Sequence, residues 1–255
     1  MATIKDVAKM AGVSIATVSN VLHGKVTVND EITKRVREVI ETLNYHPNML
    51  ASNLRNAKTV FIGVVVPSMD SIFSQLIDGI LKYYERSNLH LIIKKTNDFR
   101  NVEADAINDL INLGVKGIIM VTCNAADTNL FQRARNAGTH LLFVIRSIAD
   151  KSFSTICFDN HVSIFNATNH LLTEQPSAHV MLVTGPTEFS SELDCLNGYI
   201  EACQKHGVTP IALEVPINKQ QAFYDVLGFL ESCDTMPDHF IASGRLLAQT
   251  LQEVT

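Results

Sequence analysis

A chain of 255 residues with 46% hydrophobic and 18% charged residues is too apolar for a disordered protein and long enough for two packed domains with a small appendage. No apolar run approaches the roughly 20 residues of a membrane helix, and the polar N-terminus lacks the features of a signal peptide, so we expect a cytoplasmic protein without membrane contact. Five scattered cysteines with no C-x-x-C pair indicate reduced thiols.

The charges are distributed unevenly. Residues 1–58 hold eight Lys or Arg and five acids, a net charge of +3, and the remaining residues carry −8, which gives the total of −5. A basic N-terminal segment on an acidic body is typical of a protein in which only that segment meets nucleic-acid phosphates.

The N-terminal segment predicts two short helices joined by a tight turn. Thr3 and Asp6 have the spacing of a capping box, and Gly12 supplies the left-handed residue that ends the first helix. Ser14 is placed to cap a second helix over residues 15–22. A short turn with glycine between two short helices is the geometry of a helix-turn-helix.

A third helix and a polar linker follow. Asn29 or Asp30 caps the helix, which must end by residue 44 because the residue before Pro47 disfavours helical backbone. Residues 47–58 are polar with one apolar face, so we expect a linker that becomes a short helix when a partner covers that face.

Alternating strands and helices fill the rest of the chain. This pattern predicts an α/β fold with a parallel sheet covered on both faces. In a first lobe we expect strands at 60–66, 90–94, 118–121 and 141–145, with helices at 73–84, 102–113 and 128–137. In a second lobe, beginning near Phe158, we expect strands at 180–184, 212–215 and 240–242, with helices at 162–173, 190–206, 219–233 and 246–254.

One string carries the strongest functional signal. Residues 3–22, TIKDVAKMAGVSIATVSNVL, together with LNYHPN from Leu43, closely resemble the DNA-binding head of the lactose/purine repressor family. The resemblance continues through the linker and, more loosely, through the core to Thr255. It implies a helix-turn-helix head at 1–46, a hinge at 47–58, and two doubly wound α/β lobes at 59–158 and 159–255, the second incomplete.

The resemblance assigns roles to side chains of the head. Ile15, Ala16 and Asn20 match the base-contacting positions of the family, in a helix short enough for a major groove about 12 Å wide. The positions expected to contact phosphates are Thr3, Ser14, Thr17, Ser19, His23 and Asn29, with charge added by Lys25 and Arg35. A three-helix module that binds another protein, in which these Ser and Thr residues are only caps, is the alternative.

In the linker, Asn48, Ala51, Leu54 and Arg55 match the family's hinge helix. The resemblance implies that this helix folds on the operator and that Leu54 inserts into the minor groove and kinks the duplex. Ala51 is small enough for two symmetry-related hinge helices to approach each other. From the spacing alone, Leu54 is equally well explained as a core contact of an ordinary linker.

The core resembles sugar-binding and nucleobase-binding periplasmic modules, which hold a small molecule between two lobes at strand carboxyl ends. The matching positions are Ser68, Phe73, Arg146, Asp159 and Asn160. Phe73 would stack on a ring of the effector, while Arg146 and Asp159 bond its polar groups. Because Phe73 also lies on an apolar helical stripe, a role in the core is the favoured alternative.

The sequence departs from the family at several effector positions. Cys195 replaces an arginine, Ser243 and Gly244 replace Asn-Asp, and residues 175–177 replace a Gly-His pair. The chain also ends before the crossings by which family members return to the first lobe. We therefore expect a truncated product that responds poorly to sugars or related metabolites.

No enzyme signature is found. The sequence holds no P-loop, G-x-G-x-x-G, G-x-S-x-G or H-E-x-x-H string, and its nine histidines lack the spacing of metal ligands. We expect no enzyme activity, cofactor or metal. The prediction is a transcription regulator, a repressor, that binds a palindromic double-stranded operator as a homodimer. The rival classes are a small-molecule binding module whose head docks a protein, and an α/β enzyme with a regulatory head.

Overall fold

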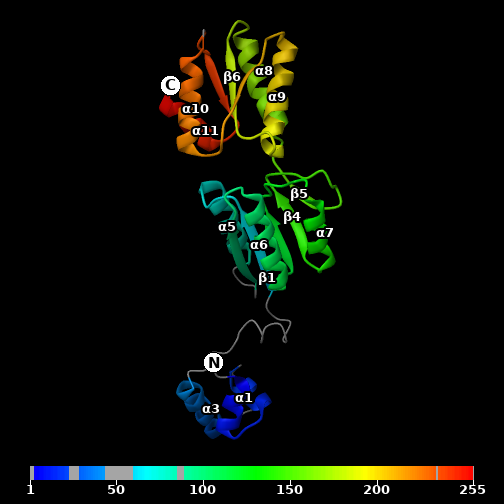
Figure 1. Cartoon of the computed structure of the whole chain (residues 1–255), viewed down its shortest axis with the longest axis vertical. Helices are drawn as coiled ribbons and strands as arrows, with labels where there is room; N and C mark the ends of the chain where they lie inside the picture. The colour runs from blue at the N-terminus through cyan, green and yellow to red at the C-terminus, as the bar shows by residue number, and fades with distance from the viewer. Residues whose placement is uncertain (1–2, 23–28, 44–59, 85–88, 234, 255) are drawn as a thin grey trace. The chain divides into compact units, whose positions relative to one another are not determined.

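The computed structural model describes residues 3–22, 29–43, 60–84, 89–233 and 235–254 of the chain. Contacts between Cα atoms divide the chain into two compact units, Met1–Thr59 and Val60–Thr255 (Figure 1). Among the described residues, no helix is long and apolar enough to cross a membrane.

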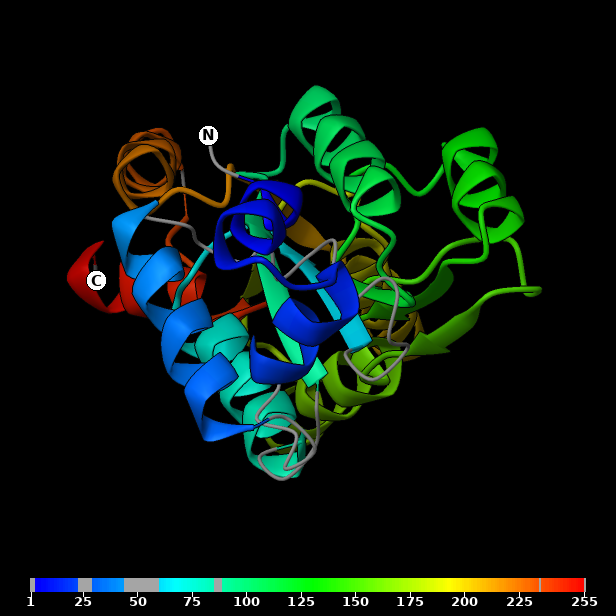
Figure 2. The same cartoon turned by 90° about the horizontal axis from the view of Figure 1, so that it is seen from below.

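In the first unit, the head, the described residues form the helices α1 (Ile4–Ala11), α2 (Ile15–Leu22) and α3 (Asp30–Thr42) (Figure 2). Apolar residues three or four positions apart place one face of each helix in a shared core, as the spacing predicts. The buried members of this core are Val7, Ala8, Ala11, Val18, Val21, Val36 and Val39. All three predicted helices are therefore confirmed.

The caps of these helices follow the predicted chemistry. The Asp6 N–H donates to Thr3 Oγ1 at 3.4 Å and the Thr3 N–H donates to Asp6 Oδ2 at 2.9 Å, which completes the capping box. Gly12 ends α1 with φ of +65°. The Ser14 hydroxyl accepts the N–H of Thr17 at 3.1 Å and so caps α2.

The second unit begins with a five-stranded parallel sheet of order β2-β1-β3-β4-β5, which forms the first lobe. Its strands are β1 (Val60–Val66), β2 (Leu89–Lys95), β3 (Gly117–Met120), β4 (His140–Val144) and β5 (Ser154–Ile156), and its helices are α5 (Ser71–Tyr84), α6 (Arg100–Asn112) and α7 (Thr128–Asn136). In Figure 1 these elements run from cyan to green.

Helices pack on both faces of this sheet. On one face, Leu110 of α6 and Phe131 of α7 pack against Ile118 and Phe143. On the other face, Phe73 and Ile77 of α5 pack against alternate residues of β1, including Val64. Side chains of a strand alternate between faces, so the continuous apolar run of β1 serves both layers.

Strand β5 is the element that the sequence did not predict. It pairs in parallel with β4, with Leu142 opposite Ser154 and Val144 opposite Ile156, and all three of its residues are exposed. A three-residue strand without a buried face has no hydrophobic periodicity, so only its backbone pairing with β4 defines it.

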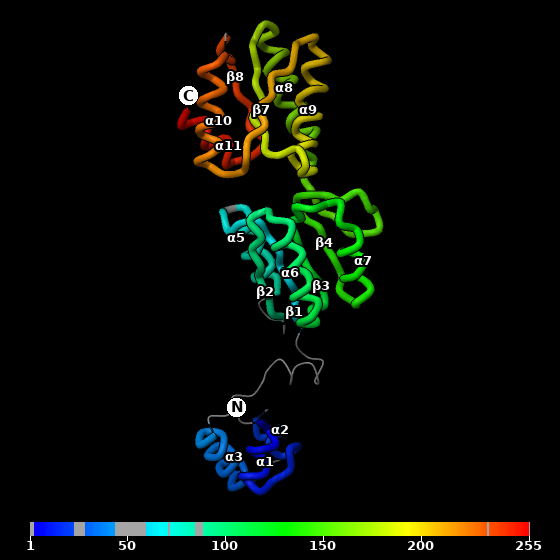
Figure 3. The backbone as a smooth tube through the Cα atoms, viewed as in Figure 1, coloured from blue at the N-terminus to red at the C-terminus, as the bar shows by residue number. Residues whose placement is uncertain are grey.

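The second lobe has a three-stranded parallel sheet of order β7-β6-β8. Its elements are α8 (Asn160–Glu174), β6 (Val180–Thr184), α9 (Ser190–His206), β7 (Ile211–Glu214), α10 (Lys219–Glu231), β8 (His239–Ala242) and α11 (Arg245–Val254). The chain passes from the first lobe to the second between β5 and α8, as the tube in Figure 3 shows.

Two helix pairs cover this second sheet. Leu172 of α8 and Tyr199 of α9 pack with Leu182 on one face. Val226 of α10 and Leu247 of α11 pack with the residues of the other face of β6. The predicted doubly wound α/β fold is thus confirmed in both lobes.

Candidate nucleic-acid interface and effector site

Helix α2 has one buried and one exposed face. Val18 is fully buried and Val21 is 6% exposed, whereas Ile15 is 42% exposed although it is apolar. Ala16 is exposed and Asn20 is half-buried. The predicted base-contacting side chains therefore lie on the surface of the first turns of α2, away from the valines that fix the helix to the head.

Three of the predicted phosphate-contacting residues also cap helices. Thr3 caps α1, Ser14 caps α2, and Asn29 caps α3 by accepting the Glu31 N–H at 2.9 Å. The Ser14 and Thr17 hydroxyls lie 2.8 Å apart. Since these residues stand at helix N-termini, where backbone N–H groups favour anions, capping and phosphate contact are compatible roles.

Several predicted contacts lie outside the described residues. These are His23 and Lys25 of the head and the hinge residues Asn48, Ala51, Leu54 and Arg55.

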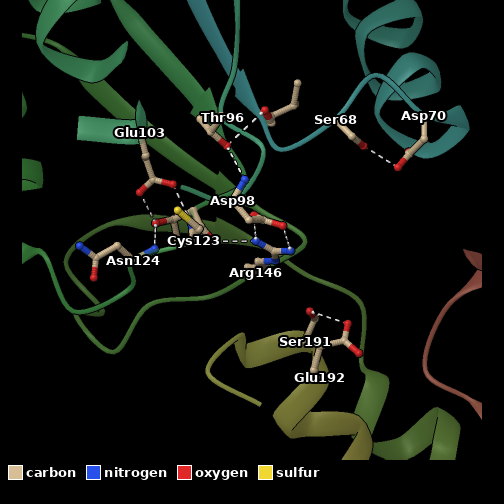
Figure 4. A network of polar contacts seen from close by, with 12 residues as sticks. Ser68, Asp70, Thr96, Asp98, Glu103, Cys123, Asn124, Arg146, Ser191 and Glu192 are labelled. Carbon is tan, nitrogen blue, oxygen red and sulfur yellow. Dashed lines mark hydrogen bonds and ion pairs between the residues drawn. The ribbon is translucent and has the colours of Figure 1, made fainter. Parts of the chain in front are cut away.

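In the core, Arg146 follows β4 and is bound by the protein itself. Its guanidinium donates to both carboxylate oxygens of Asp98, at 2.5 and 3.2 Å, and to the Thr122 carbonyl at 3.3 Å (Figure 4). Arg146 is 5% exposed. A bidentate pair of this kind is among the stronger polar contacts of proteins, so the effector role predicted for Arg146 would compete with an existing partner.

Unusual backbone conformations place both members of this pair. Asp98 has φ of +59° and Ile145, directly before Arg146, has φ of +68°. The Arg146 N–H donates to the Val144 carbonyl at 2.7 Å, which makes a γ-turn centred on Ile145. A β-branched residue disfavours this left-handed region, and strain of this kind is found where structure fixes a functional side chain.

A buried carboxylate, Glu103, lies beside the pair (Figure 4). Glu103 is 1% exposed and accepts hydrogen bonds from the Thr122 hydroxyl and the Cys123 N–H, both at 2.7 Å. Burial, followed by the negative charge of Glu103, raises the pKa of the Cys123 thiol to about 12. Glu103 thus joins the start of α6 to the residues that follow β3, a role that no local sequence pattern indicates.

The other predicted effector residues of the first lobe have structural partners. Phe73 is 8% exposed and packs among Ile77 and the residues of β1 and β4, which agrees with the core role favoured by its apolar stripe. The Ser68 hydroxyl donates to Asp70 Oδ2 at 2.5 Å.

At the crossing to the second lobe, Asp159 and Asn160 also bond the protein. Asp159 caps α8 by accepting the Val162 N–H at 3.1 Å on one carboxylate oxygen. The Asn160 side-chain amide donates to the Ser191 carbonyl at 3.4 Å. The Asn160 bond joins the start of α8 to the start of α9.

The strand ends of the second lobe converge on Glu192, another residue that the sequence analysis missed. Its Oε2 accepts from the Gly185 N–H at 2.9 Å, from the Thr184 hydroxyl at 3.2 Å and from the Ser243 hydroxyl. The Cys195 thiol lies 4.0 Å from the Ser243 carbonyl, and burial raises its pKa to about 12. Of the two departures, Ser243 therefore bonds this acid and Cys195 lies beside Ser243. In the sequence, an acid in the first turn of a helix such as Glu192 signals only a helix start.

A cavity of about 300 Å³ opens elsewhere on the first lobe. It is lined by residues from the beginnings of strands, such as Leu89, Gly117 and His140, and by Tyr84 at the end of α5. None of the predicted effector residues lines it, since those follow strand ends. Among the described residues, no group of three or more His, Cys, Asp or Glu side chains could hold a metal ion.

Two family models match the chain. Residues 3–48 match bacterial regulatory proteins of the lacI family, and residues 59–227 match the periplasmic binding proteins and sugar binding domain of the LacI family. Together they cover the head and most of the two lobes.

Individual proteins give the same result. Catabolite control protein A of Staphylococcus aureus is 30% identical over 207 residues, which are 81% of this chain and 62% of that protein. The HTH-type transcriptional regulator RegA of Clostridium acetobutylicum is 34% identical over 174 residues, 67% of this chain and 52% of that protein. The chain thus spans about 62% of the length of the S. aureus protein.

A solved structure shares the fold. The Lac repressor dimer bound to operator and the anti-inducer ONPF superposes with a TM-score of 0.70 at 21% identity, over 99% of this chain and 77% of that one. The head with its helix-turn-helix, the two α/β lobes and the two family matches identify this chain as a member of the LacI family.

Proposed function

We propose that this chain is a sequence-specific transcription regulator, a repressor, whose head binds operator DNA. The observation that carries the proposal is the division of α2 into a valine face buried in the head and a face with the exposed Ile15 and Ala16 and the half-buried Asn20. An asparagine amide can make two hydrogen bonds to adenine in the major groove, and Ile15 and Ala16 can contact a thymine methyl group.

Contacts to the phosphates would set the orientation of the head. Thr3, Ser14 and Asn29 each stand at a helix N-terminus, where the partial positive charge of the helix favours an anion. Thr17 and Ser19 of α2 are half-buried and complete the set among the described residues. Contacts of this kind position a protein on DNA and carry no sequence information themselves.

We propose further that the chain binds its operator as a homodimer. Two heads on half-sites of a palindrome require a two-fold interface. The first lobe offers exposed apolar side chains on α5 and on the edge strand β2: Ile72 is 47% exposed, Leu81 50%, Tyr83 82% and Ile93 40%. A second copy of this lobe is the occupant that the two-fold symmetry of an operator favours.

For the lobes, a sugar or related small metabolite is the proposed effector class, supported by the sugar-binding description of the matching family model. We also propose that the chain responds only weakly to such an effector. Arg146 is engaged with Asp98, and the neighbouring, uncharged Cys195 and Ser243 stand in place of charged partners for a sugar. An effector shifts an equilibrium only by its difference in affinity for two states.

The test is a gel-shift titration of the purified chain with DNA fragments from upstream of its own coding region. We expect one fragment to bind at least about a thousandfold more tightly than a shuffled sequence at physiological salt, as specific binders do. Footprinting of that fragment should show two symmetric half-sites. Equal affinity for both DNAs would reject the proposal in favour of a head that docks a protein.

A further inference from the structure

Three consecutive residues of the second lobe contact the first lobe at three separate points. Glu188, Phe189 and Ser190 lie at the start of α9. Glu188 pairs with Arg100 at the start of α6, Phe189 contacts Arg146 after β4, and Ser190 bonds the backbone of Ser147. One short segment therefore meets groups that the first lobe presents at the ends of its strands.

The central contact joins two buried side chains. The Arg146 guanidinium carbon lies 3.6 Å from the centre of the Phe189 ring, and each residue is 5% exposed. A guanidinium over an aromatic face is attractive, and the attraction grows when both groups are shielded from water. Asp98 bonds the guanidinium from its edge (Figure 4), so the face of the guanidinium remains for Phe189.

The flanking contacts fix the direction of the segment. The Ser147 N–H donates to the Ser190 hydroxyl at 2.7 Å. The Arg100 and Glu188 side chains are 61% and 51% exposed, so their ion pair lies at the rim of the contact and contributes less than the buried pair.

We propose that residues 188–190 form a latch that holds the two lobes together through the protein's own side chains, with the Phe189 ring occupying the face of Arg146. A ligand that used Arg146 would first have to displace Phe189. Its apparent affinity would equal its intrinsic affinity multiplied by the fraction of molecules in which the latch is open. The latch is independent of the DNA-binding function, and its test uses no DNA.

The first experiment uses the absence of tryptophan from the sequence. In Phe189→Trp the single indole lies against Arg146, and in the control Tyr224→Trp it lies on α10 at a position 60% exposed. We expect the emission of Phe189→Trp to be blue-shifted and its quenching by iodide to be at least about fivefold weaker than that of the control. Adding Ser190→Ala and Glu188→Gln to Phe189→Trp should raise the quenching toward the control value. Equal quenching of the two single variants would overturn the latch.

The second experiment measures hydrogen exchange of the full chain by mass spectrometry. Phe189→Ala should speed exchange in the peptides around Asp98 and Ser147 by about tenfold, while Tyr224→Ala leaves them unchanged. Exchange within β6 should stay slow in both variants, which shows that the second lobe remains folded. If Phe189→Ala does not fold, the double variant Arg100→Gln with Ser190→Ala removes only the flanking contacts and should speed the same peptides. Unchanged exchange around Ser147 in a folded latch variant would also overturn the proposal.

Discussion

Gly198 of α9 lies directly against the backbone of His161 in α8. A Cβ added at Gly198 would stand 2.2 Å from the His161 carbonyl oxygen, closer than any side chain can tolerate. This glycine therefore sets the close approach of α8 and α9, which together cover one face of the second sheet. The next residue, Tyr199, donates its hydroxyl to the Val180 carbonyl at 2.6 Å and ties the same helix to β6.

Gly198→Ala should destabilise the second lobe by about 1–3 kcal/mol, because the two helices must separate to admit the methyl group. The matched control is Gly228→Ala in α10, where an added Cβ meets nothing within 4 Å. The control should gain up to about 1 kcal/mol from the higher helix propensity of alanine. The free energies of unfolding of both variants can be measured by urea titration with circular dichroism as the signal. Equal effects of the two substitutions would contradict the close approach of the helices.

Asn20→Ala should weaken binding to the cognate operator by about 1–3 kcal/mol, because two hydrogen bonds to one base edge are lost. Affinity for random DNA should barely change, since phosphate contacts remain. Asn112→Ala, an exposed asparagine at the end of α6, is the control and should leave both affinities unchanged. Equal losses on both DNAs would show that Asn20 does not contact bases.

The capping box makes the stability of the head depend on pH. Hydrogen bonds from the side chain and backbone of Thr3 lower the pKa of Asp6 from its ordinary value of 3.8. A lowered pKa in the folded state means that the carboxylate stabilises the head above pH 3.8 and that this contribution is lost as the pH falls through the folded-state pKa. At neutral pH, the head of Asp6→Asn should unfold at a lower temperature than the head of the parent chain, as measured by calorimetry. Below pH 3.8 the difference between the two unfolding temperatures should shrink. A constant difference at all pH values would contradict this role.

The buried thiols should resist alkylation in the folded protein. Burial raises the pKa of Cys123 and Cys195 to about 12, so at pH 8 only about one molecule in ten thousand carries either thiolate. Cys157 is exposed. Iodoacetamide at pH 8 should therefore modify Cys157 well before Cys123 and Cys195, as peptide mass spectrometry can show. In 8 M urea, roughly the concentration that unfolds most domains, the three should react at similar rates.

The sequence alone determined the regular elements of the described residues other than strand β5. The strand Val180–Thr184 and the helix Ser190–His206 have the predicted bounds, because a continuous apolar run and a glycine after a helix are local signals. The division of α2 into buried valines and a more accessible face with the half-buried Asn20 follows from helical spacing in the same way. Strand β5 could not be found, since its only determinant is a partner strand.

Only the tertiary structure decided which partners the charged and polar side chains have. Asp98 and Arg146 are 48 residues apart, and Phe189 comes from the other lobe, so no local pattern could bring the three together. The same holds for Glu192, which meets Ser243 only because β6 and β8 are neighbours in the sheet. The spacing of residues along the chain fixes the local backbone conformation. A buried charged group has lost its water, so it depends on the side chain that the fold places beside it, which can be distant in sequence.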